Sequence, residues 1–119
     1  MPKVLIVDDE PGVSAAFGCF LTADGHAVRR AANAEEALRL VKAEPPDVAL
    51  LDLRMPGVDG ITVLRQVRTI SPETKVIMVS AYLNRLIRQQ VAGLGASACI
   101  QKPVDLFDLR AWVNQVLAQ

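Results

Sequence analysis

The stretch Val4-Leu5-Ile6-Val7-Asp8-Asp9 places four apolar residues directly before two acids. Two later stretches have the same form: the apolar residues 48–51 precede Asp52, and the apolar residues 76–79 precede Ser80. Short apolar runs without polar alternation are typical of strands that are buried on both faces of a parallel sheet. The sequence therefore predicts a buried sheet whose strands end in polar side chains.

Weaker runs at residues 27–31 and 98–101 bring the number of predicted strands to five. Between the strands, apolar residues recur with the period of a helix, which predicts five helices that each bury one face. The predicted faces are Val13, Ala16, Phe17, Phe20 and Leu21; Ala34, Ala37, Leu38 and Val41; Val63, Leu64, Val67 and Ile70; Leu83, Leu86, Ile87, Val91 and Leu94; and Leu109, Trp112, Val113, Val116 and Leu117.

Signals for helix ends agree with this division. Asn33 followed by Glu36 has the spacing of a capping box, which predicts a helix start. Asp24-Gly25 and Gly93-Leu94-Gly95 stand where two of the helices should end. Strands that alternate with helices predict an α/β fold, with a doubly wound parallel sheet of five strands and helices on both faces.

The bulk composition fits one domain over residues 1–119. Hydrophobic residues make up 51% of the chain, which is enough for one core, and we find no interdomain linker, low-complexity tract or internal repeat. Any output domain would lie outside these 119 residues. In open sheets of this kind, ligands bind at the carboxyl ends of the strands.

Charge and targeting signals narrow the function. Thirteen basic and thirteen acidic residues give a formal net charge of zero, so we expect no direct binding of nucleic acid. The apolar run before Asp8 is too short for a signal peptide or a membrane span, which predicts a cytoplasmic protein without membrane association. Cys19 and Cys99 form no Cys-x-x-Cys pair, and we expect both to be buried free thiols. His26 is the single histidine and is predicted to be a loop residue.

Five polar side chains should meet at one edge of the sheet: Asp8, Asp9, Asp52, Ser80 and Lys102. Crowded carboxylates repel one another, and a hard cation such as Mg²⁺ relieves that repulsion. The lysine charge and the serine hydroxyl suit the oxygens of a phosphoryl group, and a carboxylate can be the nucleophile that accepts it. Each residue alone has an ordinary structural explanation, but their joint placement favours a site.

The sequence resembles the response-regulator receiver domain (CheY-like) of two-component systems along its whole length. The motifs that carry the resemblance are Asp8-Asp9, Leu51-Asp52-Leu53-Arg54-Met55-Pro56-Gly57, Asp59-Gly60, Val79-Ser80-Ala81, Gly95-Ala96 and Lys102-Pro103. The resemblance implies a flavodoxin-like fold with strand order 2-1-3-4-5. It also implies a phosphoprotein that relays a signal by changing conformation.

In the function that the resemblance implies, Asp52 receives a phosphoryl group from a sensor histidine kinase or a histidine phosphotransfer protein, with Mg²⁺ as cofactor. Asp9 and Asp52 would be direct metal ligands, as would the backbone carbonyl of Arg54, and Asp8 would act largely through water. Ser80 and Lys102 would contact the phosphoryl oxygens. The Lys102–Pro103 bond would be cis.

Further implications concern catalysis and partners. Such a protein is a phosphoacceptor that catalyses its own phosphotransfer and slow dephosphorylation, and is not otherwise an enzyme. Its signal would pass to an output domain or a downstream protein, and a homodimer through the fourth and fifth helices is an expected form.

Two features set this sequence apart within the family. Cys99 stands where most members carry an aromatic switch residue, so transmission of the signal must differ. Arg54 and Tyr82 occupy the positions that tune the lifetime of the phosphorylated state. Both are bulky, so we expect them to shield the phosphoryl group from water; in the contrary interpretation they face solvent and tune kinase docking.

Three alternatives stay open at this stage. A haloacid-dehalogenase-type phosphatase needs an acid two residues after its Asp nucleophile, where this chain has Arg54. A flavodoxin-like cofactor carrier needs a phosphate-binding loop where this chain has Asp8-Asp9-Glu10. A pseudo-receiver that acts only as a scaffold would explain Cys99, but every chemical residue of the family is present.

Overall fold

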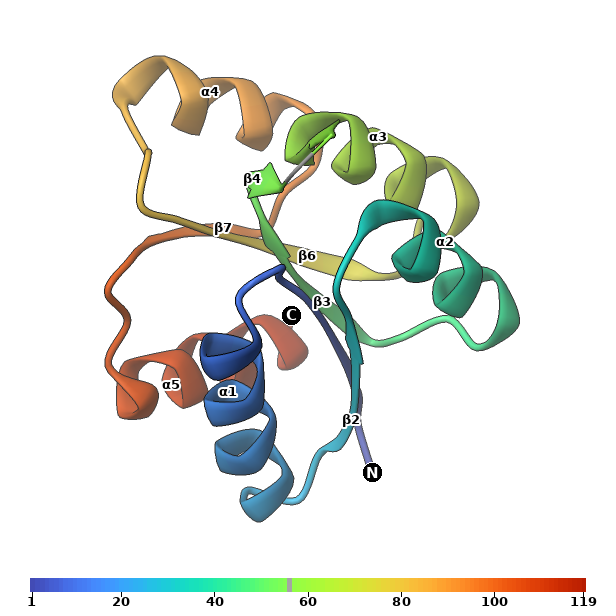
Figure 1. Cartoon of the computed structure of the whole chain (residues 1–119), viewed down its shortest axis with the longest axis vertical. Helices are drawn as coiled ribbons and strands as arrows, with labels where there is room; N and C mark the ends of the chain where they lie inside the picture. Colours follow the sequence, from blue (N-terminus) through green and yellow to red (C-terminus); the bar gives the residue numbers. More distant parts are fainter. Residues whose placement is uncertain (56) are drawn as a thin grey trace.

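Strands and helices alternate along the chain in the computed structural model, which describes residues 1–55 and 57–119 (Figure 1). Pro56, a member of one of the family motifs, lies outside the described residues. The elements are β1 (Lys3–Val7), α1 (Pro11–Ala23), β2 (Ala27–Ala31), α2 (Ala34–Ala43), β3 (Val48–Asp52), β4 (Arg54–Met55), β5 (Val58–Asp59), α3 (Gly60–Ile70), β6 (Lys75–Ser80), α4 (Arg85–Gly93), β7 (Ala98–Gln101) and α5 (Leu106–Leu117).

The main sheet has five parallel strands in the order β2-β1-β3-β6-β7. Counting only the strands of this sheet, the order is 2-1-3-4-5, so the predicted topology and fold class are confirmed. In register, Val7 pairs with Ala31 on one side and Leu51 on the other. The strand ends that carry the polar residues therefore lie at one edge of the sheet.

A second, two-stranded sheet was not predicted from the sequence. β4 and β5 pair antiparallel, with Arg54 opposite Asp59, directly after the end of β3. Two-residue strands are too short to show a periodic pattern, so this ribbon carries no sequence signal. It fixes where the backbone goes after Asp52.

Helices cover both faces of the sheet, as Figure 1 shows. α1 and α5 cover one face and α2, α3 and α4 the other, and each face has its own buried cluster. Neighbouring residues of one strand point to opposite clusters: Leu5 and Leu51 belong to the three-helix face, while Ile6 and Leu50 belong to the α1–α5 face. This alternation explains why the strands are apolar throughout.

Several predicted helix faces need correction. α1 buries Ser14, Phe17, Gly18 and Leu21, while Ala16 and Cys19 are exposed. The buried-thiol prediction is therefore wrong for Cys19. The reason is that α1 has no charged residue, so its sequence does not mark which face meets water.

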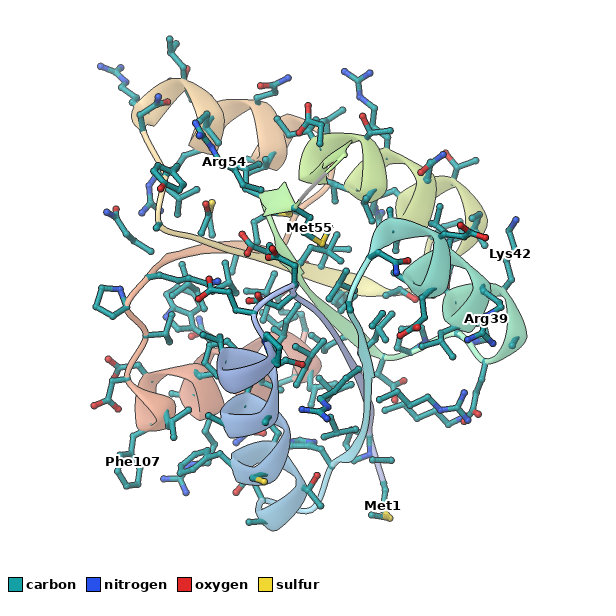
Figure 2. All side chains as sticks on the ribbon, viewed as in Figure 1. Met1, Arg39, Lys42, Arg54, Met55 and Phe107 are labelled. Carbon is teal, nitrogen blue, oxygen red and sulfur yellow. The ribbon has the colours of Figure 1, made fainter. Side chains whose placement is uncertain are left out.

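Exposed apolar residues also occur on α4 and α5. α4 buries Val91, while Leu86 is 74% exposed and was wrongly placed on the buried face. On α5, Trp112 is 38% exposed, and Phe107 projects outward at the start of the helix (Figure 2). An amphipathic pattern shows which side of a helix is apolar, but it does not show how far the neighbouring layer reaches over that side.

The predicted helix ends are confirmed. The Asn33 side chain accepts a 2.8 Å hydrogen bond from the Glu36 backbone N–H at the start of α2. α1 and α4 end at the predicted signals, where Gly25 and Gly95 have φ values of 93° and 97°. Such values favour glycine because they cost no steric strain without a Cβ.

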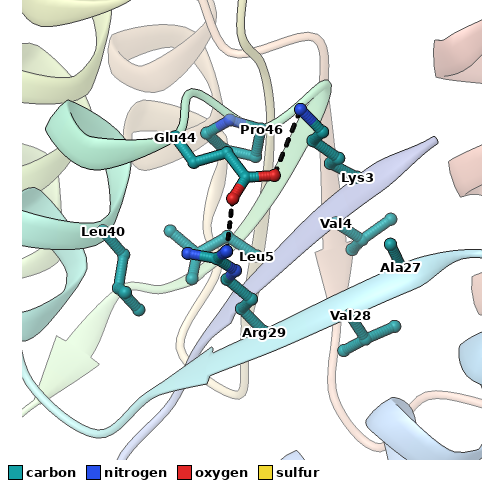
Figure 3. A pocket seen from close by; sticks show the side chains of 9 residues that line it. All are labelled: Lys3, Val4, Leu5, Ala27, Val28, Arg29, Leu40, Glu44 and Pro46. Atoms are coloured by element: carbon teal, nitrogen blue, oxygen red, sulfur yellow. Dashed lines mark hydrogen bonds and ion pairs between the residues drawn. The ribbon is translucent and has the colours of Figure 1, made fainter. Parts of the chain in front are cut away.

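Polar contacts fasten the amino ends of the strands, far from the acids. The buried Thr74 hydroxyl donates a 2.8 Å hydrogen bond to the Pro46 carbonyl, which joins the turns that lead into β3 and β6. Glu44, after α2, bridges Lys3 of β1 and Arg29 of β2 beside a small pocket (Figure 3). These contacts tie neighbouring strands and the turns before them together at this end of the sheet.

None of the helices described in residues 1–55 and 57–119 is long and apolar enough to cross a membrane. His26 lies in the predicted loop before β2, with its side chain buried.

Candidate functional site

All five predicted polar residues lie at the carboxyl edge of the sheet, where Asp9 lines a pocket with Asp52 and Lys102. Asp8 follows β1, Asp52 ends β3, Ser80 ends β6, and Lys102 follows β7. Asp8 and Asp52 are 5% and 6% exposed, an unusual degree of burial for carboxylates, and Ser80 is 0% exposed. Parallel strands in register bring these residues together although they are far apart in the sequence.

Lys102 joins the carboxylates into one cluster. Its Nζ lies 2.8 Å from Asp8 Oδ2, 3.2 Å from Asp52 Oδ2 and 3.4 Å from Glu10 Oε1. The contact with Asp8 is a short charge-assisted hydrogen bond, which is stronger than a neutral one. The lysine therefore supplies the positive charge that makes burial of the two aspartates tolerable.

The environment shifts the pKa values of two groups in the cluster. Burial raises the pKa of Asp52, and the hydrogen bond from the Arg54 N–H and the charge of Lys102 only partly oppose that effect. Burial alone would lower the pKa of Lys102, but the hydrogen bond with Asp8 and the charge of Asp52 outweigh it, so the pKa of Lys102 is raised. Lys102 is therefore firmly cationic at neutral pH.

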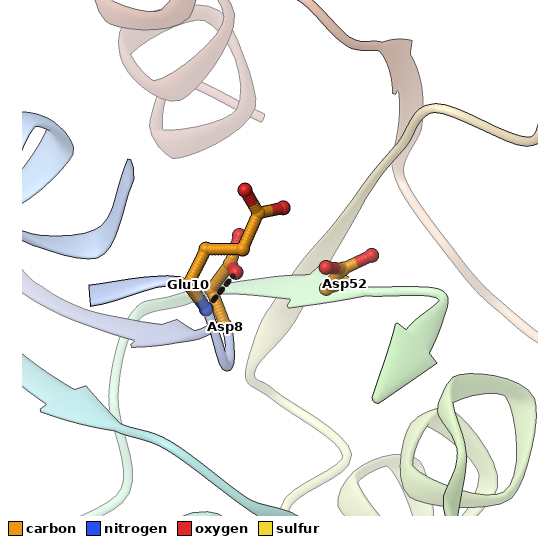
Figure 4. A group of neighbouring side chains, drawn as sticks. All are labelled: Asp8, Glu10 and Asp52. Carbon is orange, nitrogen blue, oxygen red and sulfur yellow. Dashed lines mark hydrogen bonds between the residues drawn. The ribbon is translucent and has the colours of Figure 1, made fainter. Parts of the chain in front are cut away.

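A group of three carboxylates could hold a metal ion, and it differs from the predicted set. Oxygens of Asp8, Glu10 and Asp52 lie within 4.8 Å of one another (Figure 4). Asp9 is outside this group, whereas Glu10, which sequence reasoning did not select, belongs to it. The only sequence signal for Glu10 is its place as the third acid in a row. An all-oxygen donor set suits a hard cation such as Mg²⁺.

Backbone amides hold the two buried carboxylates in place. Asp8 Oδ1 accepts a 2.9 Å hydrogen bond from the Glu10 N–H, and Asp52 Oδ1 accepts a 3.2 Å bond from the Arg54 N–H. In each aspartate, one carboxylate oxygen thus accepts a hydrogen bond from the backbone of the loop that follows, and the other accepts one from Lys102 Nζ. The carboxylates are pre-positioned, which lowers the cost of ordering them for chemistry.

Ser80 is oriented by the loop that follows β6. Its Oγ accepts a 3.1 Å hydrogen bond from the Tyr82 backbone N–H. Its own carbonyl accepts a 2.9 Å bond from the Lys102 N–H, which fixes the end of β7 beside β6. The Lys102–Pro103 bond is cis, as the resemblance implies.

Arg54 and Tyr82 form a contact beside the acids. The Arg54 guanidinium carbon lies 4.2 Å from the centroid of the Tyr82 ring, a cation–π geometry. Both residues line a pocket with Asp9, Asp52 and Lys102, although Tyr82 is 57% exposed. The arginine comes from β4 (Figure 2) and the tyrosine from the loop after β6, so the contact spans the site.

Cys99 is partly buried on β7 and packs against the three-helix face, so it is less enclosed than predicted. Its carbonyl accepts a 3.1 Å hydrogen bond from Arg88 of α4. Burial raises the pKa of the Cys99 thiol, and the charge of Arg88 opposes this only in part.

Comparison with known proteins gives the family. The model of the response regulator receiver domain matches residues 4–114. The chain belongs to this family. It is 36% identical over 115 residues to sporulation initiation phosphotransferase F of Bacillus subtilis, covering 97% of this chain and 93% of that protein.

Other relatives agree with this receiver domain assignment. Transcriptional regulatory protein BaeR of Escherichia coli is 34% identical over 116 residues, and the receiver spans about half of its length, 48%. The crystal structure of a CheY-like receiver domain protein from Methanospirillum hungatei superposes with a TM-score of 0.96 at 30% identity, covering 99% of this chain and 94% of that one. Family membership assigns this receiver to phosphorylation-dependent two-component signalling.

Proposed function

We propose that this receiver is a cytoplasmic, phosphorylation-activated switch that takes a phosphoryl group onto Asp52 from a sensor histidine kinase or a histidine phosphotransfer protein. The observation that carries the proposal is the cluster at the carboxyl edge. One oxygen of Asp52 is fixed by the Arg54 N–H, and the other lies 3.2 Å from Lys102 Nζ. A buried, oriented carboxylate beside a fixed cation is suited to attack phosphorus.

The cation site is proposed to contain Mg²⁺, with Asp8, Asp9 and Asp52 as its acids and the backbone carbonyl of Arg54 as a further ligand. Bound Mg²⁺ would neutralise the carboxylates and the oxygens of the incoming phosphoryl group. Lys102 would then exchange its carboxylate contacts for a phosphoryl oxygen. The oxygen-rich donor set of the edge supports this assignment.

The relay is proposed to begin at Ser80. Its hydroxyl, now bonded to the Tyr82 N–H, would turn to the phosphoryl group and release the loop of residues 81–84. Cys99 has no ring to rotate, so that loop and α4 would carry the change alone. The recipient would be an output domain outside these residues, a downstream protein, or a second copy bound through α4 and α5.

The proposal is tested by intact-mass measurement with acetyl phosphate or phosphoramidate and Mg²⁺. We expect the parent to gain one phosphoryl group and Asp52→Asn to gain none, because the amide is not a nucleophile of comparable strength. Asp108→Asn, an exposed acid on α5, is the matched control and should be labelled like the parent. An unlabelled parent at saturating donor, or an Asp52→Asn variant labelled as fully as the parent, would contradict the assignment.

A further inference from the structure

Glu10 lies in the loop between β1 and α1, at the rim of the acidic cluster. Its carboxylate belongs to the three-acid group with Asp8 and Asp52, and its Oε1 is 3.4 Å from Lys102 Nζ. Unlike its two neighbours it is largely solvent-accessible, with 60% of the side chain exposed. It can therefore move without disturbing the packed edge of the sheet.

The charge balance of this group is incomplete. Asp8, Glu10 and Asp52 carry three negative charges, and Lys102 supplies one positive charge among them. A divalent cation would add positive charge among these acids. Each added acid near such a cation raises its affinity through charge, whether the acid contacts the ion or one of its waters.

The distances suit a shared cation. Mg²⁺ binds oxygens at about 2.0–2.1 Å, so two ligands on opposite sides of it are about 4.2 Å apart. The oxygens of the three acids lie within 4.8 Å of one another, so small side-chain movements suffice to bring them around one ion. Glu10, on an exposed loop, has the freedom to make such a movement.

A structural role in helix capping does not account for the Glu10 side chain. Glu10 is the N-cap residue of α1, but within the described residues its side chain makes no capping hydrogen bond. Its backbone N–H holds Asp8, and a change of the side chain leaves that bond intact. Apart from the 3.4 Å contact with Lys102 Nζ, no hydrogen bond within the described residues holds the Glu10 carboxylate, so it can serve the cation site.

We propose that Glu10 is a further acid of the Mg²⁺ site, which strengthens cation binding and shares Lys102 with Asp8 and Asp52 when the cation is absent. This inference rests on the proposed function, because it takes the acidic edge to be the Mg²⁺ site. It adds Glu10 to the ligand set that the family resemblance implies.

The test is a Mg²⁺ titration followed by thermal melting, since a ligand that binds the folded state raises the melting temperature according to its affinity. Glu10→Gln should raise the Kd for Mg²⁺ about tenfold, the range seen when supporting residues of metal sites are removed. Glu73→Gln, with the same charge change on an exposed turn far along the chain, should keep the Kd within about twofold of the parent.

Two outcomes separate this inference from the proposed function. If the parent is stabilised by Mg²⁺ and phosphorylated but Glu10→Gln binds Mg²⁺ as the parent does, the role of Glu10 is refuted alone. If the parent shows neither Mg²⁺ stabilisation nor phosphoryl uptake, the proposed function fails first. Asp9→Asn belongs in the same titration, and a loss of affinity in that variant but not in Glu10→Gln would also overturn the inference.

Discussion

Arg54 and Tyr82 are two residues whose roles depend on each other. The guanidinium stacks on the ring, and both residues line the pocket that contains Asp52. Hydrolysis of a phosphorylated Asp52 needs a water in line with the departing oxygen. Arginine offers only donors and tyrosine presents mainly a ring, so the pair is better suited to exclude such a water than to orient it.

We therefore predict slow loss of phosphate from the parent. Combining Arg54→Asn with Tyr82→Glu should remove the stack, add groups that accept hydrogen bonds from water, and speed dephosphorylation about tenfold. Intact mass after removal of the donor, in excess Mg²⁺, measures the decay. Arg39→Asn, an exposed change on α2, is the control, and equal decay in parent and double variant would favour the interpretation in which both side chains serve docking.

The two thiols should differ in reactivity. Cys19 is exposed on α1, while Cys99 is partly buried and burial raises its pKa, so less of it is thiolate near neutral pH. We predict that iodoacetamide at pH 8 modifies Cys19 at least about tenfold faster than Cys99. Peptide mapping over time measures both rates. Cys19→Ser should remove the fast modification and leave the rate at Cys99 unchanged. Equal rates at the two cysteines would contradict this prediction.

At the scale of elements, the junction from β3 to α3 has no room for a side chain at Gly60. A Cβ there would lie 2.6 Å from the Leu53 carbonyl oxygen and closer still to that of Asp52. The Gly60 N–H also donates a 2.8 Å hydrogen bond to the Leu53 carbonyl. The first residue of α3 therefore packs directly against the backbone of Asp52 and Leu53.

Gly60→Ala should consequently destabilise the protein by about 2 kcal/mol, because backbone atoms cannot move aside as side chains can. Chemical denaturation measures the free energy of unfolding. Gly93→Ala is the matched control, since a Cβ at that helix position meets no atom within 4 Å and alanine favours helix. A Gly60→Ala variant as stable as the parent would show that the junction can relax.

The sequence predicted those helices and strands whose apolar residues form a long run or lie along one side. The five strands of the main sheet and the end signals at Asn33 and Gly95 were confirmed, because burial on both faces and glycine geometry leave direct marks in the sequence. The exposure of Leu86 could not be predicted from the sequence, since it depends on how much of α4 packs against the neighbouring layer. The place of Glu10 depends on the path of a loop, which has no periodicity.

At the scale of the whole molecule, Lys102 neutralises acids from two other strands. Lys102→Met should destabilise the protein without Mg²⁺ by about 3 kcal/mol, because Asp8 and Asp52 remain buried without the positive charge of the lysine. Saturating Mg²⁺ should recover part of this loss by supplying positive charge. Denaturation with EDTA or with Mg²⁺ measures both values, and equal losses in the two conditions would argue against a shared role of lysine and cation.

The difference in stability between the parent and Lys102→Met should depend on pH in one direction. Because the pKa of Lys102 is raised above its ordinary value of 10.5, its stabilising contribution is complete below about pH 10.5 and is lost as pH rises through the higher value of the folded protein. The parent should therefore keep its advantage over Lys102→Met from pH 7 to about 10. An advantage that disappears already near pH 8 would refute the pairing.

The distance along the chain between Lys102 and its partners also sets the order in which the protein is completed during synthesis. Asp8 and Asp52 leave the ribosome 94 and 50 residues before the lysine that neutralises them. At typical elongation rates of about 5–20 residues per second, Asp52 waits roughly 3–10 s for that charge. Until Lys102 has been made, Asp8 and Asp52 lack the positive charge that pairs with them in the complete fold. A chain that stops before Lys102 therefore lacks the completed cluster.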